Sequence, residues 1–107
     1  MLYSTTSTLD GRPIKKYLGI VSGETILGAN VMRDLLASIT DVVGGRSKAY
    51  EEKLEEARRL AFAEMHRKAV SLGANGIVGI TIDYETMGDH GILIVCTCGT
   101  AIIYKKV

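Results

Sequence analysis

The sequence predicts an α+β fold in which one long helix and one short helix cover an antiparallel sheet. Two observations predict it. A charged segment with helical periodicity, residues 47–72, is preceded and followed by segments whose apolar residues alternate as in strands. The last segment, residues 92–104, is apolar on both faces, as expected of a central strand that is covered on both sides. The chain has 107 residues, so residues 1–107 are expected to form a single domain.

The first third of the chain predicts a short extended arm, a strand and a short helix. Residues 2–6 predict the arm, and Asp10-Gly11-Arg12-Pro13 predicts the turn after it. Residues 14–22 carry apolar side chains on one face and two lysines at their start, which favours a strand near the edge of the sheet. A loop is expected from Gly23 to Gly28. Asn30 is then expected to cap a short helix that runs through Ile39.

The long helix is predicted over residues 47–72, with Ser47 as its N-terminal cap and Gly73 in the left-handed conformation that ends it. Its acidic residues lie in the first half and its basic residues in the last turns, an order that complements the helix dipole. We interpret these charges as a solvated face. The buried stripe is expected from apolar residues at helical spacing: Tyr50, Leu54, Ala57, Ala61, Met65 and Leu72.

Residues 77–85 predict a strand with strict alternation, and residues 86–91 predict the hairpin turn into the last strand. One face of the earlier strand is expected to carry Val78, Ile80, Ile82 and Tyr84, and the other Gly79, Thr81, Asp83 and Glu85. The two helices can cover only one face of the sheet, so a second copy of the chain is the simplest candidate to cover the other. The sequence therefore predicts a homo-oligomer.

Composition and charge exclude several classes of partner. Thirteen basic and twelve acidic residues give a formal charge of +1, so no broad basic field exists for nucleic acid or anionic membrane. The longest uninterrupted apolar run, residues 92–96, falls far short of the roughly 20 residues that span a bilayer. The N-terminus lacks the basic and apolar regions of a signal peptide. We therefore expect a cytoplasmic protein with reduced cysteines and with neither a nucleic-acid nor a membrane partner.

Cys96 and Cys98 form the first candidate site. On a strand, residues two apart lie on the same face with Cα atoms roughly 7 Å apart, so both thiols can reach one soft divalent or monovalent metal ion. Two ligands leave the site incomplete, and neither His66 nor His90 stands at ligand spacing. Symmetry copies around a ring axis are one way to complete the shell. The alternative is that both cysteines are small apolar residues of a central strand.

A second candidate site surrounds the Gly44-Gly45 pair that precedes the long helix. Arg46 stands beside the N-terminal amides of the helix, which favour anions, and Tyr50 lies one turn in. Together with Arg33 and Asp34 of the short helix, these residues are expected to form a polar corner for a small anionic ligand such as a phosphate or carboxylate. The alternative is that Arg46 pairs with Asp41 or Asp34 and holds the shape of the loop, while Tyr50 packs.

No catalytic motif appears in the sequence, which lacks the P-loop pattern, the G-x-S-x-G pattern and any Ser-His-Asp order. Asp83 and Glu85 share one strand face about 7 Å apart, a spacing that a paired-carboxylate hydrolase can use. The alternative is that both are the solvated side of a hairpin, and we prefer it. A hydrolase that uses Asp83, Glu85 or His90 is the least favoured hypothesis, and we expect no enzyme.

Four stretches of the chain carry a resemblance to a known family: "STTSTLDG", "GIVSGETILGANVMRDLLASITDVVGGRSKAYEEKLEEAR", "SLGANGIVGITIDYE" and "CGTAI". Together they resemble the YbjQ-like family, small bacterial proteins described as heavy-metal-binding domains. The resemblance runs nearly end to end. It implies a β-α-β-β unit of the dodecin-subunit-like kind, with the last strand central, and ring-like homo-oligomers that are pentamers in the family. It implies no catalytic residue.

The resulting expectation is an oligomeric protein that binds a ligand or a heavy metal without catalysis. The metal, if one is bound, is expected to be a soft divalent or monovalent ion. A structural or interaction scaffold with no small-molecule ligand is the alternative, and it differs from the first hypothesis in needing no metal at Cys96 and Cys98.

Overall fold

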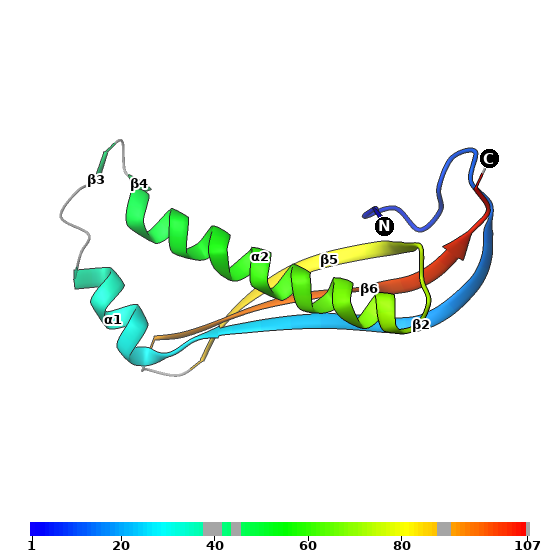
Figure 1. Cartoon of the computed structure of the whole chain (residues 1–107). Coiled ribbons are helices and arrows are strands. Elements are labelled where there is room, and N and C mark those ends of the chain that lie inside the picture. The colour runs from blue at the N-terminus through cyan, green and yellow to red at the C-terminus, as the bar shows by residue number, and fades with distance from the viewer. Residues whose placement is uncertain (38–41, 44–45, 88–90, 107) are drawn as a thin grey trace.

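The computed structural model of the chain describes residues 1–37, 42–43, 46–87 and 91–106. The molecule is elongated, about 51 × 27 × 18 Å, and both termini lie at one end while α1 lies at the other (Figure 1). The elements in chain order are β1 (Leu2–Tyr3), β2 (Ile14–Leu27), α1 (Ala29–Ala37), β3 (Val42–Val43), β4 (Arg46–Ser47), α2 (Lys48–Ser71), β5 (Gly76–Met87) and β6 (Ile92–Tyr104).

Four strands form the main sheet in the order β1-β5-β6-β2, and β6 lies inside it. β6 pairs antiparallel with both β2 and β5, so its predicted central position is confirmed. The predicted antiparallel sheet needs one correction, because β1 pairs parallel with the start of β5 and makes the whole sheet mixed. The extended arm acts as this extra strand since it supplies hydrogen-bond partners to the edge of β5, for example from the Ser4 N–H to the Ile77 carbonyl at 2.9 Å.

β2 is longer than predicted and includes most of the expected loop from Gly23 to Gly28. Gly23 marks a close contact with α2 instead of a loop. A Cβ atom added to Gly23 would stand 1.7 Å from the carbonyl oxygen of Ala61, so only glycine lets the helix approach so closely. The buried Thr97 hydroxyl of β6 donates to the same Ala61 oxygen at 3.1 Å and more distantly to the Gly23 oxygen at 3.4 Å.

The short helix begins one residue before the expected cap. The Met32 N–H donates to the Gly28 carbonyl at 3.0 Å, so α1 starts at Ala29. The Asn30 side chain accepts a hydrogen bond from Arg33 at 3.1 Å. The expected cap is therefore wrong, because Asn30 lies inside the first turn. The predicted end at Ile39 lies outside the described residues.

The long helix agrees with its predicted bounds to within one residue at each end. Gly73 follows it with φ of +83°, the left-handed conformation expected of the residue that ends a helix. The buried stripe differs in its last position. Ala69 is fully buried, whereas Leu72 lies beyond the helix and is exposed, because the stripe continues in steps of four residues from Ala61 through Met65.

The predicted strict alternation along β5 is wrong at one point. The register between β5 and β6 shifts between Val78 and Thr81, and Gly79 has φ of +62°. This β-bulge places Ile77 and Ile80 together in the cluster beneath α2, while Val78 packs on the other side of the sheet. Beyond the bulge the alternation resumes with the predicted phase.

α2 lies over β2 and β6 and covers one face of the sheet (Figure 1). The other face, which we call the open face, is partly covered by the chain itself. At one end Leu2, Leu9 and Ile14 pack against a cluster that contains the fully buried Ile102. Further along, Ile20 is 80% exposed and Ile26 57% exposed. The described residues thus cover only one end of the face that was expected to need a second copy.

The contact at Gly23 gives a stability prediction. Gly23→Ala should lower the free energy of unfolding by about 3 kcal/mol, because the new methyl group forces α2 away from the sheet at its closest approach. Gly28→Ala is the matched control, since its Cβ meets nothing within 4 Å, and it should change stability by less than about 1 kcal/mol. Urea unfolding followed by circular dichroism measures both. Equal stabilities of the two variants would contradict the proposed role of Gly23.

Candidate functional site

The two cysteines lie on the open face of the sheet. Thr97, between them, points to α2, so Cys96 and Cys98 point the other way. Cys96 stands opposite Asp83 of β5 and opposite Glu24 of β2 in the strand register. Directly opposed side chains on antiparallel strands have Cβ atoms about 5 Å apart. Asp83, Cys96 and Glu24 therefore form one row across three strands, which we call the cysteine row.

The next row along the open face contains the second thiol. Cys98 stands opposite Thr81 on β5 and Ser22 on β2. Both cysteines are free and half-buried. In a single chain the two cysteines are thus more accessible than buried core residues of a central strand would be. Both lie on the same face of the sheet, as strand geometry predicts.

The environment of Cys96 disfavours the thiolate. Burial raises the pKa of the Cys96 thiol, and the negative charges of Glu24, Asp83 and Glu85 raise this pKa further, as does Cys98. A positive ion bound beside the row would interact favourably with the same carboxylates and would favour the thiolate.

The cysteine row does not form a complete metal site in one chain. Among the described residues, no three His, Cys, Asp or Glu side chains lie close enough together to hold a metal ion. His66 lies at the helix side of the sheet, where its Nδ1 is hydrogen-bonded to the Tyr3 hydroxyl. His90 lies outside the described residues, so a role for it stays a prediction. Asp83 and Glu85 are exposed.

The structure describes the predicted polar corner only in part. Arg33 bonds to Asn30 within its own helix, and Asp34 is exposed. Tyr50 is half-buried and packs against the cluster shared by α1, α2 and the ends of the strands. Arg46 lies in β4, but its side chain and the two glycines before it lie outside the described residues. The polar corner therefore remains a prediction.

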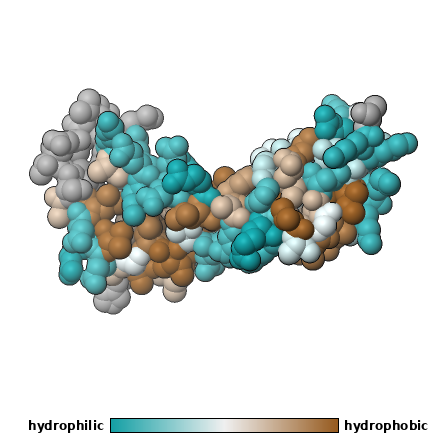
Figure 2. All heavy atoms as spheres, in the orientation of Figure 1, coloured by the Kyte–Doolittle hydropathy of each residue, from teal (hydrophilic) through white to brown (hydrophobic). Residues whose placement is uncertain are grey.

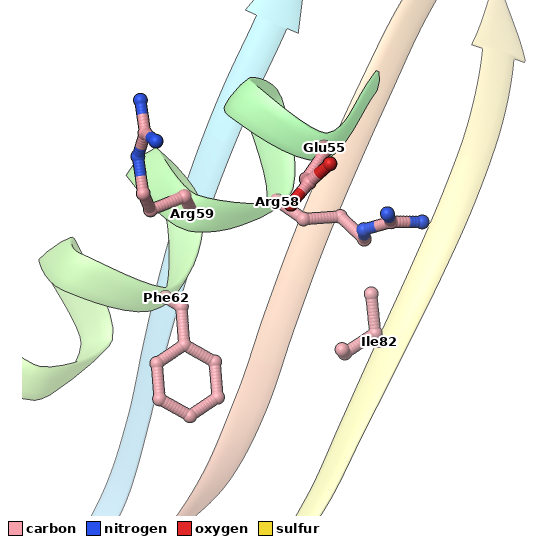
Figure 3. A pocket seen from close by; sticks show the side chains of 5 residues that line it. All are labelled: Glu55, Arg58, Arg59, Phe62 and Ile82. Carbon is pink, nitrogen blue, oxygen red and sulfur yellow. The ribbon is translucent and has the colours of Figure 1, made fainter. Parts of the chain in front are cut away.

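A hollow that sequence reasoning missed lies between α2 and β5. It has a volume of about 360 Å³, and we call it the α2–β5 groove (Figure 3). A second hollow of about 190 Å³ adjoins it and shares Phe62 and Ile82. The groove is lined by Glu55, Arg58, Arg59, Phe62 and Ile82.

One pair of polar groups stands at the groove. The Arg58 guanidinium donates a hydrogen bond to the Tyr84 hydroxyl at 3.1 Å, and this bond raises the Arg58 pKa. Figure 3 shows Arg58 extending over Ile82 toward β5, whereas Arg59 extends to the opposite side of the helix. The sequence placed Ile82 and Tyr84 on one face correctly, but it held no signal that this face lies on the helix side or that α2 leaves the two residues 42% and 43% exposed.

Comparisons with known proteins show sequence relatives along nearly the whole chain. A family model described as "Putative heavy-metal-binding", named YbjQ, matches residues 1–105. UPF0145 proteins from two bacteria are close in sequence. That of Geobacillus kaustophilus is 54% identical over 106 residues, covering 99% of this chain and 100% of the relative. That of Anoxybacillus flavithermus is 51% identical over 106 residues, with the same coverage. The names of these relatives state no activity.

A solved structure shares the fold. A crystal structure of a protein of unknown function from Pediococcus pentosaceus, which belongs to the DUF74 family, matches with a TM-score of 0.62. The match covers 98% of both chains, and the two sequences are 19% identical, so this likeness speaks for the fold alone. In the described part of the chain, no helix is both long and apolar enough to cross a membrane.

The cysteine row gives a reactivity prediction. In a Cys98→Ser background at pH 8, iodoacetamide should alkylate Cys96 more slowly in the folded protein than in urea, because the raised pKa leaves less thiolate to react. Asp83→Asn removes a negative charge beside Cys96, which lowers the Cys96 pKa and should accelerate the reaction. Asp10→Asn, in the turn at the far end of the molecule, is the control and should leave the alkylation rate unchanged. Mass spectrometry of timed samples gives the rates, and equal rates for both aspartate variants would count against the row.

Proposed function

Because the chain belongs to the YbjQ family, whose model is described as heavy-metal-binding, we propose that it binds a soft metal ion and assembles with copies of itself. The observation that carries the proposal is the cysteine row, in which Cys96 stands between Asp83 and Glu24 with Cys98 beside it. The names of the relatives point to no catalysis, and the proposal is for a binding protein rather than an enzyme.

The ligand types support a soft or borderline metal. Thiolates favour ions such as Zn²⁺ and Cu(I), and Zn²⁺ also accepts carboxylate oxygens. Cys96 and Cys98 supply the sulfur atoms, and Asp83 and Glu24 supply oxygens in the adjacent positions. Since the described residues of one chain bring no three such side chains together around one point, the proposal requires a neighbouring copy to supply further ligands.

The apolar side chains of the open face support assembly. Ile20 and Ile26 stand out from β2 on this face, and Met87 is exposed at the end of β5. Exposed apolar surface of this kind favours contact with another copy. On the side of the molecule that carries α2, which Figure 2 shows, apolar side chains also reach the surface in several places.

The edges of the sheet suit a ring. β2 has no strand neighbour on its outer side among the described residues, and β5 has none beyond the segment that pairs with the N-terminal arm. β2 and β5 both run antiparallel to β6, so they run parallel to each other. A head-to-tail contact between β2 of one copy and β5 of the next repeats from copy to copy, and it forms a ring where the rotation between neighbouring copies closes. We propose five copies, as the family resemblance implies, in the cytoplasm, where thiols remain reduced.

In the scaffold alternative, the chain assembles with copies of itself but binds no metal. The incomplete ligand set of a single chain favours it. The two hypotheses differ only in the metal content of the assembled protein and in its dependence on the two thiols.

The metal proposal predicts stoichiometric metal in protein purified without a histidine tag from medium that contains zinc and copper. Cys96→Ser with Cys98→Ser should remove it, because the thiolates are the strongest ligands of the row. Asp83→Asn should weaken zinc binding about tenfold in competition with a chromogenic chelator, while Asp10→Asn should not. Plasma mass spectrometry gives the metal content. Metal-free wild-type protein of unchanged assembly size would favour the scaffold.

The assembly proposal predicts a particle much larger than one chain in sedimentation velocity at micromolar concentration. Ile26→Lys should reduce its size, because a charge on the open face cannot be buried against a second copy without a large cost. Val70→Lys on α2 is the matched control, since Val70 is 53% exposed and Ile26 57% exposed, and it should leave the size unchanged. A wild-type protein that sediments as a single chain would refute assembly.

A further inference from the structure

The α2–β5 groove is an open hollow whose volume is that of a small-molecule site. Its volume of about 360 Å³ lies within the range of roughly 300–1,000 Å³ that such sites occupy. It lies on the helix side of the sheet, so it uses none of the residues of the cysteine row.

The apolar part of the groove is shaped by Phe62 and Ile82. Tyr3 packs its ring edge against Phe62, with ring centroids 4.7 Å apart and planes at 68°. Tyr3, in the N-terminal arm, thus contacts one side of the Phe62 ring, and Phe62 remains half-buried. A flat apolar molecule can stack or pack edge-on against such a ring while its other side contacts Ile82.

The polar lining of the groove comes from Glu55, Arg58 and Arg59, and Tyr84 stands beside it, hydrogen-bonded to Arg58. Arg58 uses one N–H in its bond to the Tyr84 hydroxyl, and a guanidinium has five N–H groups. No described carboxylate lies within ion-pair distance of Arg58, although Glu55 is near enough to raise the Arg58 pKa. The Tyr84 hydroxyl accepts from Arg58 and keeps its own proton to donate. The pair therefore presents several hydrogen-bond donors and one positive charge.

We propose that the α2–β5 groove binds a small organic anion with a flat apolar body, of the class of aromatic carboxylates and sulfonates. The body lies between Phe62 and Ile82, and the anionic group lies against Arg58 and the Tyr84 hydroxyl. Arg58 favours this class over a neutral apolar molecule, because an anion forms a charge-assisted hydrogen bond with the guanidinium, whereas a neutral molecule leaves the guanidinium bonded to water.

The test uses the fluorescent anion 8-anilinonaphthalene-1-sulfonate and its uncharged analogue N-phenyl-1-naphthylamine. Arg58→Gln should weaken binding of the sulfonate about tenfold, the loss expected for a charge-assisted hydrogen bond, and should leave the uncharged analogue unaffected. Arg67→Gln is the matched control, because Arg67 is an exposed arginine of the same helix and does not line the groove. It should change the sulfonate affinity less than about twofold, as a surface charge does. Equal effects of the two arginine variants would overturn the proposal.

A second pair of variants locates the dye on one face of the sheet. Ile82→Glu should abolish binding of the sulfonate, whereas Ile20→Glu, on the open face, should not. Methyl NMR of the wild-type protein locates the dye without any substitution. The dye should shift the methyl resonances of Ile80 and Ile82 and leave those of Ile20 and Ile26 unchanged. Shifts confined to the open face would overturn the proposal. Dissociation of the assembly by Ile82→Glu would also overturn the proposal, because it would show that a second copy of the chain occupies the groove.

Discussion

The close contact between α2 and the sheet at Gly23 governs the rest of the structure. There the backbone of β2 touches the helix at the Ala61 carbonyl, and the buried Thr97 hydroxyl bonds to that same oxygen. This contact fixes the helix above β2 and β6. Two consequences follow from that position. The helix side of β5 stays partly uncovered and forms the α2–β5 groove, and no helix in the described part of the chain covers the opposite face of the sheet.

The side chains of α2 explain why one chain leaves so much apolar surface. Its buried positions are Ala57, Ala61, Met65 and Ala69. Small side chains allow the helix to approach closely, but each buries little apolar area. A domain of this size already buries only about two thirds of the surface of its unfolded chain. Contacts with another copy would therefore add burial that a helix with three alanines in its stripe does not supply.

The sequence predicted features that depend on local pattern and missed those that depend on tertiary contact. The doubly apolar residues 92–104 identified the central strand, and Gly73 identified the end of α2, because both signals lie in neighbouring residues. Gly23 looked like a loop residue, yet the same lack of a side chain also permits a close helix contact. Alternation placed Cys96 and Cys98 on one face, but it could not tell which face α2 would cover. The groove was missed for the same reason, since periodicity contains no information on the lateral position of a helix.

β5 links the two candidate surfaces, and its bulge at Gly79 decides what each of them contains. Before the bulge, Ile77 faces α2. In a regular strand, Thr81, Asp83 and Glu85 would then face α2 as well, because they are separated from Ile77 by even numbers of residues. The extra residue reverses this phase. It turns Ile82 and Tyr84 toward Phe62 and Arg58, and it turns Asp83 toward Cys96. A single inserted residue thus gives the groove its apolar wall and the cysteine row its carboxylate.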